Sequence, residues 1–179
     1  FPTDTLHYRA TSPESIDDFF KRMGNKSRYN IKRSIRILES SFQKVEYKCY
    51  SSINDIEKLS KDLELIASKT YQRGLDAGFI LNDEFYDRLN ITSKKNMLRT
   101  YVLYINDVPV SYWLAFKNDD ILSLHSTGYD PTYSNYEIGT ALLIHLIKDT
   151  AKDKQVKYID FGWGDALYKR KYANICWNE

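Results

Sequence analysis

This sequence has little cysteine and no long apolar run. Its two cysteines, Cys49 and Cys176, lie far apart without the CxxC spacing of a metal or redox site, so we expect reduced thiols in a cytoplasmic protein. No apolar run reaches the ~18–20 residues of a membrane-spanning helix, and no signal peptide is visible. The 3 histidines are scattered without the spacing of metal ligands, so we expect no metal site.

An excess of charge of one sign is also missing. The 26 Lys and Arg residues nearly balance the 24 Asp and Glu residues, which leaves a net charge of +2. Nucleic-acid-binding domains usually carry a strong basic excess, so we expect no nucleic-acid partner, although the 15 tyrosines would suit base stacking. A basic helix face at Arg28, Lys32, Arg33 and Arg36 is interpreted as solvated surface, or as facing an anionic substrate or another part of a larger protein.

The chain is expected to form one domain over residues 1–179, because it has the length of a single domain and contains no internal linker or repeat. Its first residue is Phe1 rather than Met, which leaves open that it is the C-terminal part of a longer protein. Periodicity predicts helices that feed a mainly antiparallel sheet, so the fold class is α/β (α+β).

Apolar alternation and turn residues place the elements. Strands are predicted at residues 5–10, 44–50, 99–105, 108–116, 121–129 and 156–161. The three strands between 99 and 129 form a meander, with tight turns at Asn106–Asp107 and at residues 118–120. Helices are predicted from an N-cap at Thr11 or Ser12 to Gly24, from Ser27 to Phe42, from Ser52 to Gly74, from Asn82, over 137–152 and after the last strand.

The start of the helix at 137–152 is a candidate anion site. A strand and a loop deliver the chain to Glu137, after which Ile138, Gly139, Thr140 and Ala141 open the helix. Free N–H groups and the helix dipole favour an anion there, and a glycine lets a phosphate approach the backbone. The alternative is that Gly139 is only a small residue where the helix meets the sheet.

The stretch "DFGWGDALYKRKYA" after the last strand carries a resemblance to a known family. It resembles the D-F-G-x-G-D-x-x-Y-K-x-x-W/F signature of the CelD-like (cellulose-biosynthesis-type) branch of the GNAT N-acetyltransferase superfamily. The matching positions are Asp160, Phe161, Gly162, Gly164, Asp165, Tyr168, Lys169 and Tyr172. "YEIGTALL" is similar to the family's R/Q-x-x-G-x-G/A pyrophosphate loop with Tyr136 in place of Arg/Gln, and "SRYNIKRSIRILE" resembles a basic helix of the same branch.

The resemblance covers the chain from about Tyr8 onward, and it implies a mixed, mostly antiparallel sheet flanked by helices. It implies that the sheet splays between the family's fourth and fifth strands, here 121–127 and 156–161, where acetyl-CoA or another acyl-CoA would lie as co-substrate. Residues implied to bind that co-substrate are Ile138, Gly139, Thr140, Ala141 and Lys169.

Acyl transfer to an amine needs a base for the ammonium proton and an acid for the leaving thiolate. The resemblance places Tyr168 as the acid, and a phenol with a pKa of ~10 stays protonated at neutral pH; a packing tyrosine is the alternative. His125 is the candidate base because alternation puts it on a polar face with Ser123 and Thr127. A structural histidine, Glu137 or a water relay are alternatives for that role.

The acceptor amine is expected to be held by Asp160, Trp163 and Asp165, and Asp160 is also a lesser candidate base. The leading hypothesis is a bacterial acyl-CoA-dependent N-acyltransferase acting on an amino sugar or another cell-envelope precursor. One alternative is an aminoacyl-tRNA-dependent, FemAB-like transferase, whose relatives carry two such domains, so that a second GNAT-like domain or a homodimer would be the partner. The other is a non-catalytic GNAT-like binding module, which the tyrosine at position 136 favours.

Overall fold

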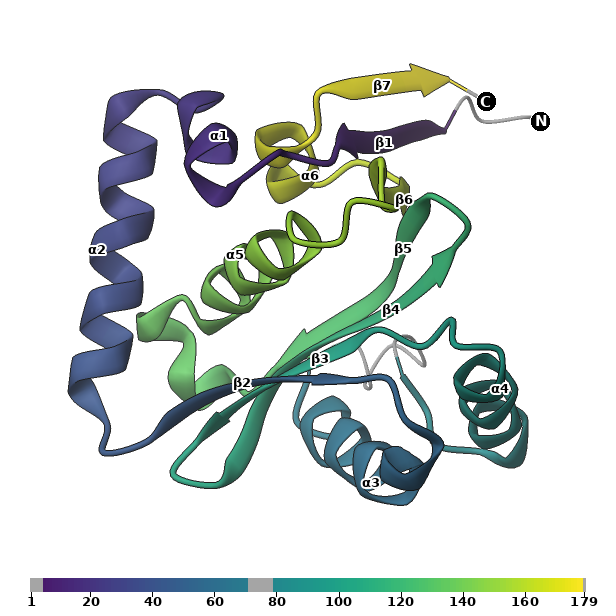
Figure 1. The fold of residues 1–179 in the computed structure, drawn as a ribbon. Helices are drawn as coiled ribbons and strands as arrows, with labels where there is room; N and C mark the ends of the chain where they lie inside the picture. The colour runs from purple at the N-terminus through teal and green to yellow at the C-terminus, as the bar shows by residue number, and fades with distance from the viewer. Residues whose placement is uncertain (1–4, 71–78, 179) are drawn as a thin grey trace.

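A mixed sheet runs through the centre of the computed structural model, which describes residues 5–70 and 79–178 (Figure 1). The seven strands of the described chain lie in the order β2-β3-β4-β5-β6-β1-β7. They span β1 Leu6–Thr11, β2 Val45–Tyr50, β3 Thr100–Ile105, β4 Val108–Asn118, β5 Ile121–Tyr129, β6 Tyr158–Trp163 and β7 Ile175–Asn178. Neighbours pair antiparallel except β5 and β6, which are parallel, so the expected mixed, mostly antiparallel sheet is confirmed.

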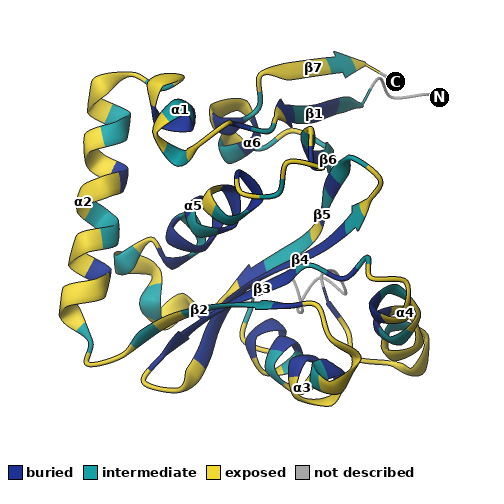
Figure 2. Cartoon of the chain, in the orientation of Figure 1, coloured by how far each residue is buried: buried dark blue, intermediate teal, exposed yellow. Residues whose placement is uncertain are grey.

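Helices cover both faces of the sheet (Figures 1 and 2). Their bounds are α1 Ile16–Lys21, α2 Asn25–Ser41, α3 Ile56–Ala67, α4 Asp83–Lys94, α5 Ile138–Thr150 and α6 Leu167–Tyr172, with short 3-10 turns η1 Ile53–Asp55 and η3 Pro131–Tyr136. One apolar cluster unites α1, α2 and α5 with one face, and a second packs α3 and α4 on the other. The central strand β4 contributes to both, with Trp113 and Ala115 on the α5 side and Tyr112 and Leu114 on the α3 side.

The meander from β3 to β5 is confirmed. The β3–β4 hairpin turns at Asn106 and Asp107, whose φ values of 49° and 67° are those of a tight turn that matches the twist of the strands. Asp119 has φ 51° in the turn between β4 and β5. Asparagine and aspartate tolerate this left-handed conformation better than other side chains, which is why both turns are legible in the sequence.

The sheet splits between β5 and β6. These two strands pair only from Ile121↔Tyr158 to Ser123↔Asp160, whereas β5 continues to pair with β4 as far as Tyr129. The two strands therefore diverge after Ser123, and no strand of the described residues lies beside the β5 edge beyond that residue. This is the splay that the family resemblance implies, and the divergence confirms it.

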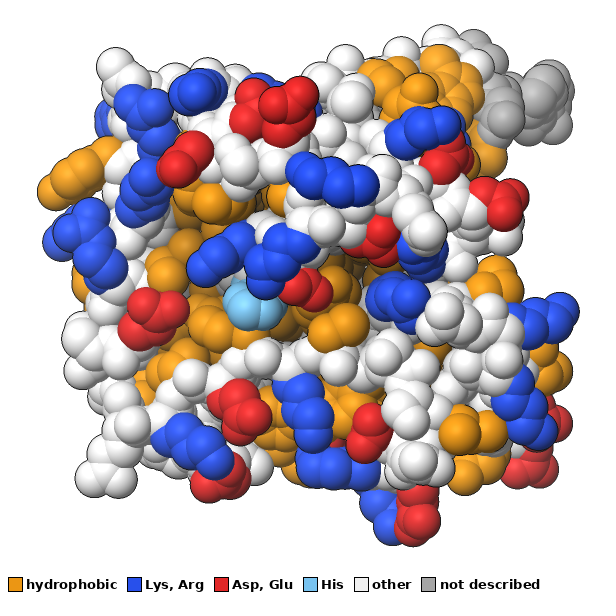
Figure 3. All heavy atoms as spheres, in the orientation of Figure 1, with side chains coloured by type: hydrophobic (Ala, Val, Ile, Leu, Met, Phe, Trp, Pro, Cys, Tyr) orange, Lys and Arg blue, Asp and Glu red, His pale blue; other side chains and the backbone are white. Residues whose placement is uncertain are grey.

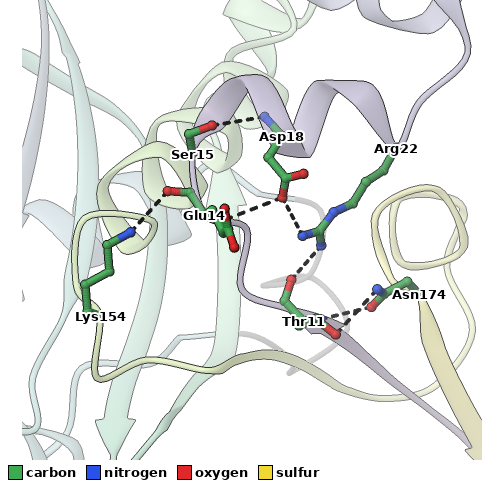
Figure 4. Close-up of polar contacts among 7 residues, drawn as sticks. All are labelled: Thr11, Glu14, Ser15, Asp18, Arg22, Lys154 and Asn174. Carbon is green, nitrogen blue, oxygen red and sulfur yellow. Dashed lines mark hydrogen bonds and ion pairs between the residues drawn. The ribbon is translucent and has the colours of Figure 1, made fainter.

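Several predicted boundaries are wrong. Helix α1 is capped by Ser15, not by Thr11 or Ser12, because the Ser15 hydroxyl accepts the Asp18 N–H at 3.1 Å (Figure 4). Thr11 is instead held in β1, where its N–H donates to Asn174 Oδ1 at 2.9 Å. Arg22 completes this junction by donating to the Thr11 carbonyl and to Asp18.

Other differences are smaller. Helix α2 begins at Asn25 instead of Ser27, and the segment after Ser52 is a 3-10 turn followed by α3, which ends at Ala67. The predicted end at Gly74 lies outside the described residues. The expected loop before α5 contains the 3-10 turn η3, and strand β7 was not predicted. In the described ranges 5–70 and 79–178, no helix has the length and apolar character needed to cross a membrane.

Candidate functional site

Two cavities meet in the split between β5 and β6. The first, of about 340 Å³, opens at the N-terminus of α5, and we call it the α5 chamber. The second, of about 560 Å³, lies against β6 and is called the β6 chamber. Trp113, Thr127 and Tyr168 line both chambers and so form their shared wall.

The α5 chamber is built on the first turn of a helix. Ile138, Gly139 and Thr140 line it, and a Cβ added to Gly139 would come no closer than 4.0 Å to the Tyr129 ring. The first N–H groups of a helix have no acceptor within the helix, so they can receive an anion, and Gly139 leaves room for it. Of the described residues, no Lys or Arg lines this chamber, and Glu137 does.

Two positions of the expected phosphate loop lie elsewhere. The Ala141 N–H already donates to the Glu137 carbonyl at 3.0 Å, and Ala141 lines a hollow of about 320 Å³ between α2 and α5. Figure 3 shows that hollow with an apolar floor and charged side chains of both signs around it. Lys32 and Arg36 of the basic helix face are among its lining residues, together with Asp17 and Glu39. Tyr136 packs its ring against Phe42, 4.9 Å between centroids.

The shared wall consists of two aromatic side chains and a threonine. Tyr168 is half-buried in α6, with its ring edge-on to Trp113 and Phe161 at 5.7 and 6.2 Å. Burial raises the pKa of Tyr168, so its hydroxyl keeps its proton at neutral pH. Trp113 is 5% exposed, and its Nε1–H has no hydrogen-bond partner among the described residues.

Asp160 is buried in the β6 chamber with its oxygens already occupied. His7 Nε2 lies 2.7 Å from Oδ1, Arg9 Nη2 lies 2.7 Å from Oδ2, and the Gly162 N–H donates to Oδ1 at 2.7 Å. Burial alone would raise the pKa of Asp160, but the hydrogen bonds from Arg9, Gly162 and His7 outweigh it and hold that pKa below its usual value. Asp160 is therefore an ionised anchor between β6 and β1.

The remaining motif residues brace the turn between β6 and α6. Asp165 accepts hydrogen bonds from Arg170 and from the Tyr8 hydroxyl, the latter at 2.8 Å. Lys169 is buried, lines the β6 chamber but not the α5 chamber, and donates to the Trp163 carbonyl. Burial lowers the pKa of Lys169 against the attraction of Asp160 and Asp165. The Trp163 ring is 51% exposed at the mouth of this chamber.

His125 lies at an irregularity in β5. Leu124 pairs with Ala115 and Ser126 with Leu114, so His125 is the extra residue of a β-bulge. The expectation that His125 shares a face with Thr127 is wrong, because a bulge inverts the alternation that follows it. The exposed His125 ring lies edge-on to Phe85 and Phe116 at 6.3 and 6.0 Å on the α4 side, while Thr127 pairs opposite Trp113.

His125 nevertheless lines the β6 chamber together with Tyr168. Partial burial and the nearby Arg88 guanidinium lower the pKa of His125, which keeps the imidazole neutral at pH 7 and able to accept a proton. Residues of the candidate acid and the candidate base thus line one cavity, with the His125 ring on the α4 side of the sheet, and their catalytic roles stay predictions.

Besides Leu124, three residues of the β6 chamber were not singled out from the sequence: His7, Trp113 and Ser126. Trp113 reads as a core residue of a central strand, and Ser126 as one of many strand serines. His7 has no local signal at all, because its partner Asp160 is 153 residues away. Within the described parts of the chain, no three His, Cys, Asp or Glu side chains gather in a way that could hold a metal ion.

Comparisons with known proteins agree with this geometry. The family model "Acetyltransferase (GNAT) domain" matches residues 25–170. Among solved structures, FemX superposes with a TM-score of 0.66 at 8% identity, covering 96% of this chain and 59% of its own. The C-terminal domain of a lysylphosphatidylglycerol synthetase from Agrobacterium fabrum gives a TM-score of 0.62 at 6% identity, covering 93% of this chain and 48% of that one.

A third structure, L-PGS from Bacillus licheniformis, gives a TM-score of 0.59 at 14% identity, covering 92% of this chain and 46% of that one. At these identities the likeness shows a shared fold, and this chain spans about half the length of each of these relatives. No curated protein sequence matches. With residues 25–170 matched and the split sheet in place, the chain belongs to the acetyltransferase (GNAT) domain family.

Proposed function

We propose that this protein transfers an acyl group, acetyl in the first instance, from CoA to an amine of an amino sugar or another cell-envelope precursor. The observation that carries the proposal is the divergence of β5 and β6, which opens one chamber on each side of Tyr168. A reaction that joins two substrates needs two such approaches to one point, because each substrate must reach the reacting atoms without displacing the other.

The donor fits the α5 chamber. The pantetheine arm resembles a short peptide and would pair with the β5 edge after Ser123, which no strand in the described part of the chain covers. The diphosphate would rest on the N–H groups of Ile138, Gly139 and Thr140, where the helix dipole attracts negative charge. Lys169 lines the other chamber, so we assign it to holding the Trp163 carbonyl at the turn instead of to a phosphate.

The chemistry would take place at the shared wall. The amine nitrogen attacks the thioester carbonyl carbon, the C–N bond forms and the C–S bond breaks. His125, or a water molecule beside it, accepts the proton lost by the ammonium, and the Tyr168 hydroxyl donates a proton to the departing thiolate. The backbone N–H groups freed by the β5 bulge would stabilise the carbonyl oxygen as it gains charge.

A second donor class, an aminoacyl-tRNA, is favoured by one observation. The α5 chamber contains Glu137 and, in the described chain, no cation, and Tyr136 stands where the family places Arg or Gln. A diphosphate would therefore be held by backbone groups alone. The near-complete superposition on FemX is in keeping with this alternative, and loss of donor binding altogether would leave a non-catalytic module.

Thermal unfolding with and without donor separates these possibilities. A ligand at 100 times its Kd adds about 2.7 kcal/mol of stability, so acetyl-CoA at millimolar concentration should raise the melting temperature by several degrees. If aminoacyl-tRNA raises the melting temperature and no CoA thioester does, the donor is an aminoacyl-tRNA. An unchanged melting temperature with acetyl-CoA, free CoA, longer acyl-CoAs and aminoacyl-tRNA would overturn both donor assignments.

A further inference from the structure

Helix α2 carries charge of one sign along most of its length. Its single acidic residue, Glu39, lies in the last turn. The cations lie within residues 26–36, about 15 Å of helix, where Lys26 extends the basic helix face. Lysines, arginines and acids nearly balance over the whole chain, so this stretch is a local segregation of positive charge.

The positive charge of α2 is not neutralised within the protein. In the part of the chain that the structure describes, neither Lys26 nor any cation of the basic helix face forms an ion pair with a carboxylate. Helix α3 shows the contrast, because there Lys58 pairs with Asp62 at 2.5 Å and Lys61 with Glu57 at 2.6 Å. The α2 cations are therefore available to an anionic partner.

The contacts that these cations do make are with neutral groups. Arg28 donates to the side-chain amide oxygen of Asn25 at 2.7 Å, and Arg36 Nε donates to the Lys32 carbonyl at 3.3 Å. The Lys32 ammonium lies 4.8 Å from the centre of the Phe20 ring. Such contacts orient the side chains and leave their full charge in place.

Two large apolar side chains are exposed among the cations. Tyr29 is 62% exposed and Ile37 is 41% exposed. Residues four apart lie on one side of a helix, so Tyr29, Arg33 and Ile37 form one row, beside the row that begins at Arg28. The outer side of α2 thus combines unpaired positive charge with an aromatic ring and a branched aliphatic side chain.

This side of the helix is fixed outward and accessible. Ile31 and Leu38, on the opposite side, are buried in the apolar cluster that includes α5. Helix α2 stands at the edge of the molecule with most of its outer surface exposed (Figures 1 and 2). Figure 3 shows Lys and Arg side chains along that edge with apolar side chains beside them. A straight, uncovered helix of 17 residues can lie flat on an extended surface.

We infer that the outer side of α2 docks on a lipid bilayer that contains anionic phospholipids. The cations would attract the negative headgroups, while Tyr29 and Ile37 would enter the boundary between headgroups and acyl chains. A nucleic acid is favoured less, because its phosphates offer nothing to an exposed isoleucine and the net charge of +2 lacks the usual basic excess. The inference goes beyond the proposed function and needs neither donor nor acceptor.

Cosedimentation with vesicles tests the inference. The protein should bind vesicles of equal amounts of phosphatidylcholine and phosphatidylglycerol roughly 100-fold more tightly than vesicles of phosphatidylcholine alone, at ~0.1 M salt. Most of this binding should be lost at ~1 M salt, where charges are screened within about 3 Å. Equal binding to both vesicles, or none at the lower salt, would overturn the inference. A single-stranded RNA bound at least as tightly as the anionic vesicles would overturn it in favour of a nucleic-acid surface.

Matched variants locate the docking surface. Each basic residue near an anionic bilayer contributes roughly fivefold to binding, so Lys26→Gln with Arg33→Gln should weaken it about 25-fold. The control is Lys61→Gln with Lys157→Gln, which removes as much charge from exposed residues paired with Glu57 and Asp120. An equal loss of vesicle binding in the two double variants, each with a native melting curve, would refute the assignment to α2. Vesicle binding and donor-induced stabilisation are separate measurements, so failure here is distinct from failure of the proposed function.

Discussion

The two chambers on either side of Tyr168 are built from different parts of the chain. The α5 chamber uses a helix N-terminus, aromatic rings and hydroxyl side chains, and no Lys or Arg of the described residues lines it. The β6 chamber uses side chains, among them Asp160 and Lys169, that already have partners in the protein. The first can receive a charged group through the backbone, whereas the charged side chains of the second are held by the protein itself. A change in one chamber should therefore spare the other.

A substitution in the shared wall should affect both chambers and give the largest loss of activity. Tyr168→Phe should lower kcat by about 100-fold, because it removes the proton donor but keeps the ring that packs on Trp113 and Phe161. Both KM values should change little. In the parent enzyme kcat should persist until the pH exceeds the raised pKa of Tyr168, above ~10. The control is Tyr158→Phe, on β6 outside both chambers. Equal kcat values in the two variants would show that Tyr168 serves only in packing.

The next effect concerns the β6 chamber. Asp160→Asn should destabilise the fold by about 2–3 kcal/mol, because Arg9 and His7 lose a buried carboxylate. The pKa of Asp160 is lowered in the folded state, so its contribution is fully present above the unfolded value of ~3.9 and is lost as the pH falls through the folded value. Urea unfolding at pH 7 and pH 3 measures both. Asp165→Asn, in the exposed pair with Arg170, should show no comparable loss.

A methyl group added in the α5 chamber should weaken donor binding without lowering the stability of the fold. Gly139→Ala should raise the donor KM about tenfold by covering backbone N–H groups, with the acceptor KM unchanged. Stability should not fall, because the methyl group has room and alanine favours a helix over glycine by about 0.5–1 kcal/mol. Gly24→Ala, where the added Cβ also meets nothing, serves as control. An acceptor KM that rises with the donor KM would contradict the separation of the two chambers.

The smallest effect is expected at the turn beneath Trp163. Gly164 has φ +83°, a conformation that costs other residues roughly 1–2 kcal/mol. Gly164→Ala should lower the free energy of unfolding by about that amount and weaken acceptor binding only slightly. Urea unfolding measures the first and acceptor KM the second, and an unchanged free energy of unfolding would show that the turn relaxes.

The fold was readable from the sequence where short-range rules decide. Asn106–Asp107 marks a hairpin, and the apolar periodicity marks α5, because both signals lie within the element itself. Strand β7 was missed because residues 175–178 form a strand only by pairing with β1 at the other end of the chain. The CelD-like subtype stays a prediction.

The candidate site, too, was predictable only where the signal lies within one segment of the sequence. Gly139 was expected to bind the co-substrate and Tyr168 to act as the acid; both line the α5 chamber, and these roles stay predictions. The face of His125 was wrong, because a bulge depends on the partner strand and leaves no mark in β5 alone. The partners of Asp160 were invisible for the same reason, since His7 and Arg9 approach it only in the folded sheet.

Strand β1 lies between β6 and β7, so the first described strand is sandwiched by the last two (Figure 1). During synthesis β1 leaves the ribosome more than 140 residues before its partners exist, and its unpaired edges must wait for them. The meander and α3 can pack early, whereas His7, Asp160 and Trp163 can come together only once β6 has been made. The β6 chamber therefore depends on two strands far apart in the sequence, and a chain cut short before β6 would keep part of its core but have no place for an acceptor.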